Sequence, residues 1–166
     1  KYRVDLKPVR IQGIGEAEEL FGAEETANEM IAVYLFDETE ILRCRQEIND
    51  QKMVAGLIYL DNYDEALESV EEVRRSLLTA LIDRKINKYI SGMNGITKKL
   101  EKDKYFFAIK QRYVQELRDN RFSLLEEVKT VNIGNEMAVT LSIGLGMGGE
   151  TYGQNYEFSR MAIDMA

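Results

Sequence analysis

The sequence predicts an α/β domain whose sheet contains antiparallel strands. From residue 53 onward, strand-like and helix-like segments follow one another in the order β-αα-β-β-α-β-α. Two of these strands are separated only by a short turn, which joins antiparallel neighbours rather than parallel ones. The chain has 166 residues, of which 45% are apolar and 31% charged, a mixture typical of a globular protein that can bury a core. We therefore expect an antiparallel-containing sheet with flanking helices, not a doubly wound parallel sheet.

Residues 1–37 are predicted to be the end of a domain whose front is missing. The segment "YRVDLKPVRI" alternates apolar and polar residues, which is typical of a strand, and Pro8 favours an edge position. Residues 12–28 are acidic and contain glycine, so they predict a connection with room for one helical turn. "MIAVYLF", residues 30–36, predicts a second strand. Two strands and a loop cannot form an independent core, and we expect the chain to be a piece of a longer protein.

Residues 38–52 predict a short connector helix. Ile41, Leu42, Cys44 and Ile48 form a narrow apolar stripe at helical spacing, and Asp37 or Thr39 can cap the start. The stripe has two interpretations, pairing with its copy in a homodimer or packing against its own domain. Cys44 is interpreted as a packing residue rather than a nucleophile.

The elements of the third region, residues 53–166, follow from their apolar spacing. A continuous apolar run predicts a buried strand, and apolar residues near a 3.6-residue period predict helices. The expected elements are a strand at 53–60, one or two helices within 64–90, two strands within 95–110 joined by a turn at 101–104, a helix at 111–131, a strand at 137–146 and a final helix at 156–166. Residues 144–149, "GLGMGG", match the spacing G-x-G-x-x-G, but no βαβ unit surrounds them. We interpret these glycines as a flexible loop.

Composition excludes several functions. The formal charge of −7 argues against a nucleic-acid polymer as a partner. The chain has no histidine, so it lacks the usual general base, the usual zinc ligand and any Ser-His triad. The single cysteine excludes an intrachain disulfide framework. No apolar run approaches the roughly 20 residues of a membrane-spanning helix.

Acidic and polar residues stand where the first strand of the third region ends. Asp61 and Asn62 follow "LIYL" directly, and ligands of open α/β folds bind at the carboxyl ends of strands. Asp61 is therefore a candidate metal ligand. The alternative is that Asp61 caps a helix and Asp103 is a turn residue, roles in which aspartate is common.

Three segments in this order carry a family resemblance. "YLDNYDE", the hairpin segment "DKYFFAI" and "VTLSIGLG" resemble the GGDEF family of diguanylate cyclases, whose pattern runs "FIDLDxFK", "RxGGDEF" and "TxSIG". The resemblance covers residues 53–166 and implies a ferredoxin-like, palm-type sheet whose last strand lies beyond the chain end. Upstream, "YLFDETE" is similar to the close of a PAS domain. The combination resembles the membrane-anchored cyclic-di-AMP phosphodiesterases of bacteria. It implies a cytoplasmic position and a DHH-type catalytic domain further along the same parent chain.

The signature of the family is altered in this sequence. Residues 101–105, "EKDKY", replace G, G, D, E and F. Lys104 thus stands in place of an acid that the resemblance implies in catalysis, and the guanine-binding Asn and Asp of the family fall on Ser69 and Leu78. We expect no diguanylate cyclase activity and at most a weak ATPase.

One acidic pair is kept. Asp61 and Asp103 match metal-binding positions of the family, so the resemblance implies a site for Mg²⁺ or Mn²⁺. Asn62, Tyr63 and Lys104 are the corresponding candidates for binding ATP or another nucleotide, although Lys104 also suits a solvated hairpin tip. The predicted function is a regulatory module of a cyclic-di-AMP phosphodiesterase that binds ATP with Mg²⁺. The alternative is a ligand-free dimerisation domain that transmits signals from a PAS sensor to a downstream enzyme.

Overall fold

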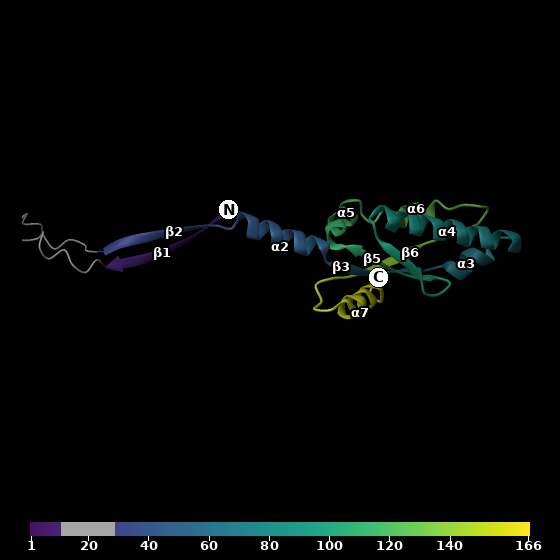
Figure 1. Ribbon diagram of the computed structural model, residues 1–166. Coiled ribbons are helices and arrows are strands. Elements are labelled where there is room, and N and C mark those ends of the chain that lie inside the picture. Colours follow the sequence, from purple (N-terminus) through teal and green to yellow (C-terminus); the bar gives the residue numbers. More distant parts are fainter. Residues whose placement is uncertain (11–28) are drawn as a thin grey trace, which may run out of the picture. The chain divides into compact units, whose positions relative to one another are not determined.

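The computed structural model describes residues 1–10 and 29–166, and the chain divides into two compact units, Lys1–Glu47 and Ile48–Ala166 (Figure 1). The connection predicted for residues 12–28 lies outside the described residues.

The first unit contains a two-stranded antiparallel ribbon. Strand β1 (Tyr2–Arg10) pairs with β2 (Glu29–Asp37) in a register that runs from Tyr2 opposite Asp37 to Arg10 opposite Glu29. Directly opposed residues share a face, so one face carries Val4 with Leu35 and Leu6 with Val33. On the other face basic groups lie over aromatic rings, as Arg3 does over Phe36 at 4.7 Å. The ribbon therefore has one apolar face and one face of mixed aromatic and charged character.

Helix α2 (Thr39–Gln51) follows β2 directly. Asp37 marks its start, because the Asp37 carboxylate accepts a hydrogen bond from the Thr39 backbone N–H at 2.9 Å. Hydrogen bonds from Thr39 hold the pKa of this carboxyl below its ordinary value. No residue of α2 is buried. Cys44 is exposed in this single chain, and its interpretation as a packing residue rather than a nucleophile stays a prediction.

The second unit is built on a four-stranded sheet in the order β4-β5-β3-β6, in which every neighbouring pair is antiparallel. Its strands are β3 (Met53–Leu60), β4 (Ile96–Lys99), β5 (Lys104–Lys110) and β6 (Leu141–Gly146). The predicted α/β fold class with an antiparallel-containing sheet is confirmed. Val54, Leu57 and Ile58 are fully buried, because β3 lies inside the sheet with helices over both faces. Burial on both faces explains the continuous apolar run in its sequence.

Helices cover both faces of this sheet. They are α3 (Tyr63–Glu68), α4 (Glu72–Gly92), a 3-10 turn η1 (Gln111–Tyr113), α5 (Val114–Asp119), α6 (Leu124–Lys129) and α7 (Tyr152–Ile163). Figure 1 shows α4, α5 and α6 on one side of the sheet and α7 on the other. Leu78, Ile82, Ile86 and Ile90 recur every four residues on α4 and form its buried face. Within the described parts of the chain, no helix is long and apolar enough to cross a membrane.

The helix predicted at 111–131 is interrupted. Arg121 and Phe122 have φ angles of 51° and 53°, in the left-handed region that ends a helix. Phe122 N–H then bonds back to the Leu117 carbonyl at 2.8 Å, and the Asn120 side chain accepts from Ser123 N–H at 3.3 Å. The apolar period continues through the break, which is why the sequence predicts one helix where the structure has two short ones after η1.

Two glycines of "SIGLG" allow α7 to approach β6 closely. A Cβ at Gly144 would overlap the Ser159 carbonyl oxygen, and a Cβ at Gly146 would overlap that of Asn155. The flexible loop predicted for residues 144–149 is therefore wrong for these two positions, which belong to β6. The following turn is held by the buried Asn155, whose side chain accepts from Gly149 N–H at 2.8 Å and donates to the Met53 carbonyl at 3.1 Å.

Candidate functional site

Asp61 and Asp103 lie at one end of two neighbouring strands. Asp61 follows β3, and Asp103 precedes β5. The strands are joined at this end by a hydrogen bond from Leu60 N–H to the Asp103 carbonyl at 2.9 Å. The Asp61 carboxylate is exposed and accepts a hydrogen bond from the Ser142 hydroxyl at 2.9 Å. The predicted pair of carboxylates is thus positioned by β3, β5 and β6 at one edge of the sheet.

The alternative role of Asp61 as a helix cap is not what the structure shows. The residue at the N-cap of α3 is Asn62, and it makes no side-chain capping bond. Instead, the Asn62 side chain donates to the Ala138 carbonyl at 2.8 Å and accepts from Thr140 N–H at 2.9 Å. These bonds hold residues 138–140 outside the ladder, so β6 begins at Leu141 and not at residue 137 as predicted. Both the NH₂ group and the oxygen of the Asn62 side-chain amide are therefore engaged in hydrogen bonds that hold the structure.

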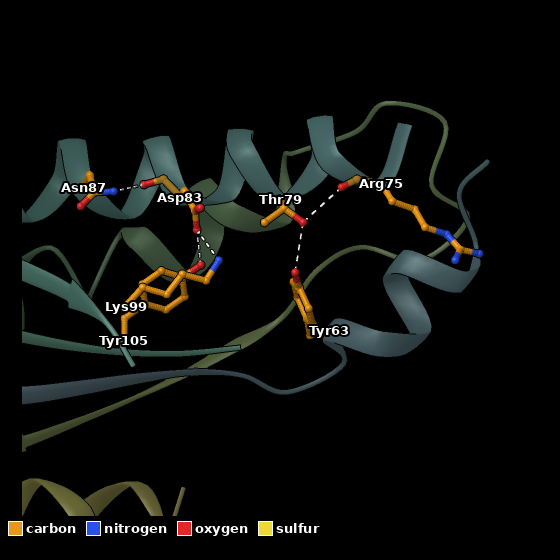
Figure 2. A network of polar contacts seen from close by, with 7 residues as sticks. All are labelled: Tyr63, Arg75, Thr79, Asp83, Asn87, Lys99 and Tyr105. Carbon is orange, nitrogen blue, oxygen red and sulfur yellow. Dashed lines mark hydrogen bonds and ion pairs between the residues drawn. The ribbon is translucent and has the colours of Figure 1, made fainter. Parts of the chain in front are cut away.

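Tyr63 lies in the core of the second unit. Its side chain is buried, and its hydroxyl lies 3.1 Å from the Thr79 hydroxyl on α4 (Figure 2). Two further positions correspond to those from which the cyclase family is implied to read guanine. Leu78 is fully buried, and the Ser69 hydroxyl, at the C-cap of α3, donates to the Ala66 carbonyl at 2.7 Å. One position is therefore a buried leucine, and the other is a serine engaged in a local hydrogen bond.

Both lysines of the hairpin turn are paired with carboxylates. Lys102 Nζ lies 2.6 Å from Asp64 Oδ2 at the start of α3, and Lys104 Nζ lies 2.9 Å from Glu101 Oε2. The bond to Asp64 raises the pKa of Lys102, and the bond to Glu101 raises the pKa of Lys104. The Lys104 ammonium also lies over the Tyr59 ring, 5.4 Å from its centroid. Exposed pairs of this kind exchange readily with other anions because each contributes little stability.

A polar network behind the hairpin was missed by sequence reasoning. Tyr105 on β5 donates its hydroxyl proton to the Asp83 carboxylate on α4, and Lys99 Nζ on β4 lies 2.9 Å from the same carboxylate (Figure 2). Burial and the bond to Asp83 raise the pKa of the Tyr105 phenol. The usable signal was a tyrosine inside an apolar strand, because a buried phenol requires a hydrogen-bond partner. The network fixes both hairpin strands to α4 next to Asp103.

The carboxylate oxygens of Asp61 and Asp103 suit a cation such as Mg²⁺ only if a bound ligand supplies further oxygen atoms. Within residues 1–10 and 29–166, no group of three or more His, Cys, Asp or Glu side chains comes together in a metal-binding arrangement. Mg²⁺, however, is commonly held by one or two carboxylates plus phosphate oxygens and waters. Asp61 and Asp103 would be the two carboxylates, and the bound cation would neutralise phosphate charge.

The fold and this sheet edge define the class of protein. Solved structures with the same fold include a sensory box/GGDEF family protein from Caulobacter crescentus, at 19% identity and TM-score 0.56 over 76% of this chain and 85% of that one. Another is the active GGEEF domain of a diguanylate cyclase from Vibrio cholerae, at 13% identity and TM-score 0.58 over 76% and 81%. The second unit therefore has the fold of a GGDEF domain.

The sequence places the chain more narrowly. The family described as "Cyclic-di-AMP phosphodiesterase GdpP-like, GGDEF domain" matches residues 58–166, and the chain belongs to this family. It is similar to the cyclic-di-AMP phosphodiesterases GdpP of Geobacillus thermodenitrificans, at 25% identity, and GdpP of Bacillus subtilis, at 23%. It is also similar to PdeA of Listeria monocytogenes, at 25%. Each alignment covers 81% of this chain and 20% of the relative, so the chain spans about a fifth of the length of these relatives.

Proposed function

We propose that this chain is a regulatory module of a cyclic-di-AMP phosphodiesterase and forms no cyclic dinucleotide itself. Its family membership supports the regulatory role. The observation behind the lost cyclase activity is the hairpin, where Lys104 is paired with Glu101 at the position of a catalytic acid. The phosphodiesterase reaction itself is assigned to a DHH-type domain elsewhere in a longer, membrane-anchored parent, with this module on the cytoplasmic side.

The burial of Leu78 supports the same proposal. Leu78 offers no hydrogen-bonding group to a purine edge, and its side chain is fully buried. A cyclase would need both the missing acid and a pocket for guanine. The test is incubation of the purified chain with GTP and Mn²⁺, followed by chromatography for cyclic di-GMP. We expect no product above a protein-free control, and steady accumulation of product would overturn the proposal.

A second candidate function is binding of ATP with Mg²⁺, with slow hydrolysis at most. It is favoured by the hydrogen bond between Leu60 and Asp103, which brings the ends of β3 and β5 together. In this proposal Asp61 and Asp103 hold the cation, Lys104 meets phosphate oxygens after leaving Glu101, and Asn62 contributes its backbone carbonyl. That carbonyl already accepts a bond from Ala66 N–H at 2.9 Å but has a second lone pair. Titration calorimetry of ATP with and without Mg²⁺ tests this function separately from cyclase activity.

The alternative is a module that binds no ligand and transmits signals through pairing of its connector helix. The exposed apolar positions of α2 favour it, and it is compatible with a PAS-like first unit, which the apolar face of the β1–β2 ribbon supports. Absence of any ATP–Mg²⁺ heat in the calorimeter, combined with self-association in sedimentation, would favour this alternative.

A further inference from the structure

Lys102 connects the hairpin turn to the start of α3. Its Nζ lies 2.7 Å from Asp64 Oδ1 and 2.6 Å from Asp64 Oδ2, so one ammonium group bonds to both oxygens of one carboxylate. The two residues are 38 positions apart in the sequence, whereas Lys104 bonds to Glu101 within the turn itself. The Lys102–Asp64 pair therefore ties together two segments of the chain, residues 61–64 and 101–104.

The same two segments carry the candidate cation ligands. Asp61 stands three residues before Asp64, and Asp103 directly follows Lys102. The Leu60 N–H bonds to the Asp103 carbonyl at 2.9 Å, which holds the two segments side by side. Besides the bond to Asp64, the charge of Asp103 raises the pKa of Lys102, so the ammonium group lies within electrostatic reach of Asp103. The Lys102–Asp64 pair is thus a neighbour of the site proposed for ATP and Mg²⁺.

The charges of these segments oppose an anionic ligand in the unbound chain. Residues 61–64 and 101–104 contain four carboxylates and two lysines, which gives a net charge of −2. A triphosphate needs cationic partners, but both lysines are bonded to carboxylates. The Lys102 and Asp64 side chains are each 61% exposed, and an exposed pair contributes little to stability. A phosphate oxygen can therefore replace Asp64 at Lys102 without any change in the core.

We infer that Asp64 competes with the nucleotide for Lys102: Asp64 holds Lys102 in the unbound chain, and Lys102 moves to a phosphate oxygen when ATP binds with Mg²⁺. The inference rests on the proposed binding of ATP with Mg²⁺, to which it adds one phosphate-binding residue and one carboxylate that lowers the affinity. Because the pair ties α3 to the hairpin turn, the exchange also releases these two segments from each other. Nucleotide binding therefore changes how the hairpin is held.

A double-mutant cycle in the full 166-residue chain tests the exchange, with the affinity for ATP measured by titration calorimetry in the presence of Mg²⁺. Asp64→Asn should raise the affinity about two- to fivefold, because the carboxylate that competes for Lys102 is gone. Lys102→Gln should lower the affinity about threefold, because a contact with phosphate is lost. In the Lys102→Gln chain, Asp64→Asn should give a clearly smaller gain, since no lysine remains to be released. Equal gains with and without Lys102, or no gain in the chain that keeps Lys102, would overturn the inference.

Glu65→Gln is the matched control for net charge. Glu65 is exposed and directly follows Asp64 in the first turn of α3, so this change removes one negative charge from the same turn and leaves the Lys102–Asp64 bond in place. Salt screens exposed charges that make no direct contact, so the affinity for ATP should change by less than about twofold. A gain as large as that of Asp64→Asn would assign the effect to net charge and overturn the inference.

Asp61→Asn distinguishes failure of the exchange from failure of ATP binding itself. If the unaltered chain binds ATP with Mg²⁺, and Asp61→Asn weakens this binding while Asp64→Asn leaves it unchanged, the exchange is refuted and the proposed nucleotide binding stands. If neither the unaltered chain nor any variant binds ATP, the proposed nucleotide binding and the exchange are both refuted.

Discussion

Replacing Tyr105 with phenylalanine should destabilise the second unit by removing one hydrogen bond and almost no packing. Tyr105 is 1% exposed, and its hydroxyl donates to the Asp83 carboxylate. A hydrogen bond to a charged group contributes about 1.5–3 kcal/mol. The Asp83 side chain is 34% exposed and keeps Lys99 as a partner, so water can replace part of the lost bond. We therefore expect a loss near the lower end, about 1.5 kcal/mol, or a fall in Tm of about 3–6 °C.

The assay is a double-mutant cycle with Asp83→Asn, measured by urea unfolding of all four chains. If the two side chains stabilise the fold through their mutual bond, the coupling free energy should be about 1 kcal/mol. The matched control is Tyr152→Phe, because Tyr152 is 73% exposed, and this change should alter stability by less than about 0.5 kcal/mol. Additivity of the Tyr105 and Asp83 changes within about 0.3 kcal/mol would refute the reasoning.

The same pair predicts an alkaline effect. The pKa of the Tyr105 phenol is raised in the folded chain, whereas in the unfolded chain it is near 10. Above that pH the unfolded chain loses a proton that the folded chain keeps, so stability should fall as pH rises. The fall between pH 9.5 and 11, values on either side of roughly the ordinary phenol pKa, should be shallower in Tyr105→Phe. Equal slopes in both chains would contradict the raised pKa.

Three further changes test other parts of the second unit. Asp61→Asn should weaken Mg²⁺-dependent ATP binding at least about tenfold, as loss of one of two carboxylate ligands implies. The melting temperature should stay constant, because the asparagine side chain still accepts a hydrogen bond from the Ser142 hydroxyl. Equal ATP affinities of the two chains in calorimetry would exclude Asp61 as a metal ligand. Gly146→Ala should lower the free energy of unfolding in urea by about 3 kcal/mol because its Cβ overlaps Asn155. Gly92→Ala, with open space around it, should leave stability unchanged or slightly raised. Similar losses at both positions would argue against the close contact between α7 and β6. Asn62→Ala should increase hydrogen exchange of Thr140 N–H, which bonds to the Asn62 side chain at 2.9 Å, and unchanged protection would mean that other contacts hold this segment.

Elements with a strong local pattern were predictable from the sequence, and those fixed by distant side chains were not. Residues 53–60 were predicted as a strand with the bounds that β3 has, because an apolar run of that length has few alternatives. The start of β6 was misplaced because it depends on the Asn62 amide, more than 70 residues away in sequence. The break between α5 and α6 depends on the backbone at Arg121 and Phe122, residue types that rarely take a positive φ.

The candidate site shows the same division. The neighbouring placement of Asp61 and Asp103 follows from the strand order, which the family resemblance implies. The pairing of Lys102 with Asp64 depends on how α3 meets the hairpin, and the contact of the Tyr63 hydroxyl with Thr79 depends on how α3 meets α4. No spacing rule expresses these contacts. Cys44 was interpreted as a packing residue because its helical stripe is apolar, and it is exposed in this single chain. A stripe of apolar residues predicts that this surface of the helix is buried, but it does not indicate whether the contact is with the same chain or with another one.

The junction between α2 and the sheet has a mechanical consequence. Only Lys52 separates the last residue of α2 from the first residue of β3, and the Lys52 carbonyl is tied to Gln111 N–H at 2.8 Å. The last turn of α2 is therefore joined to an interior strand of the sheet without a flexible linker. A force applied to the last turn of α2 would act on β3 along its length, and Asp61 directly follows β3. Force of this kind would reach the far edge of the sheet through covalent bonds and the paired β5, without requiring any loop to rearrange.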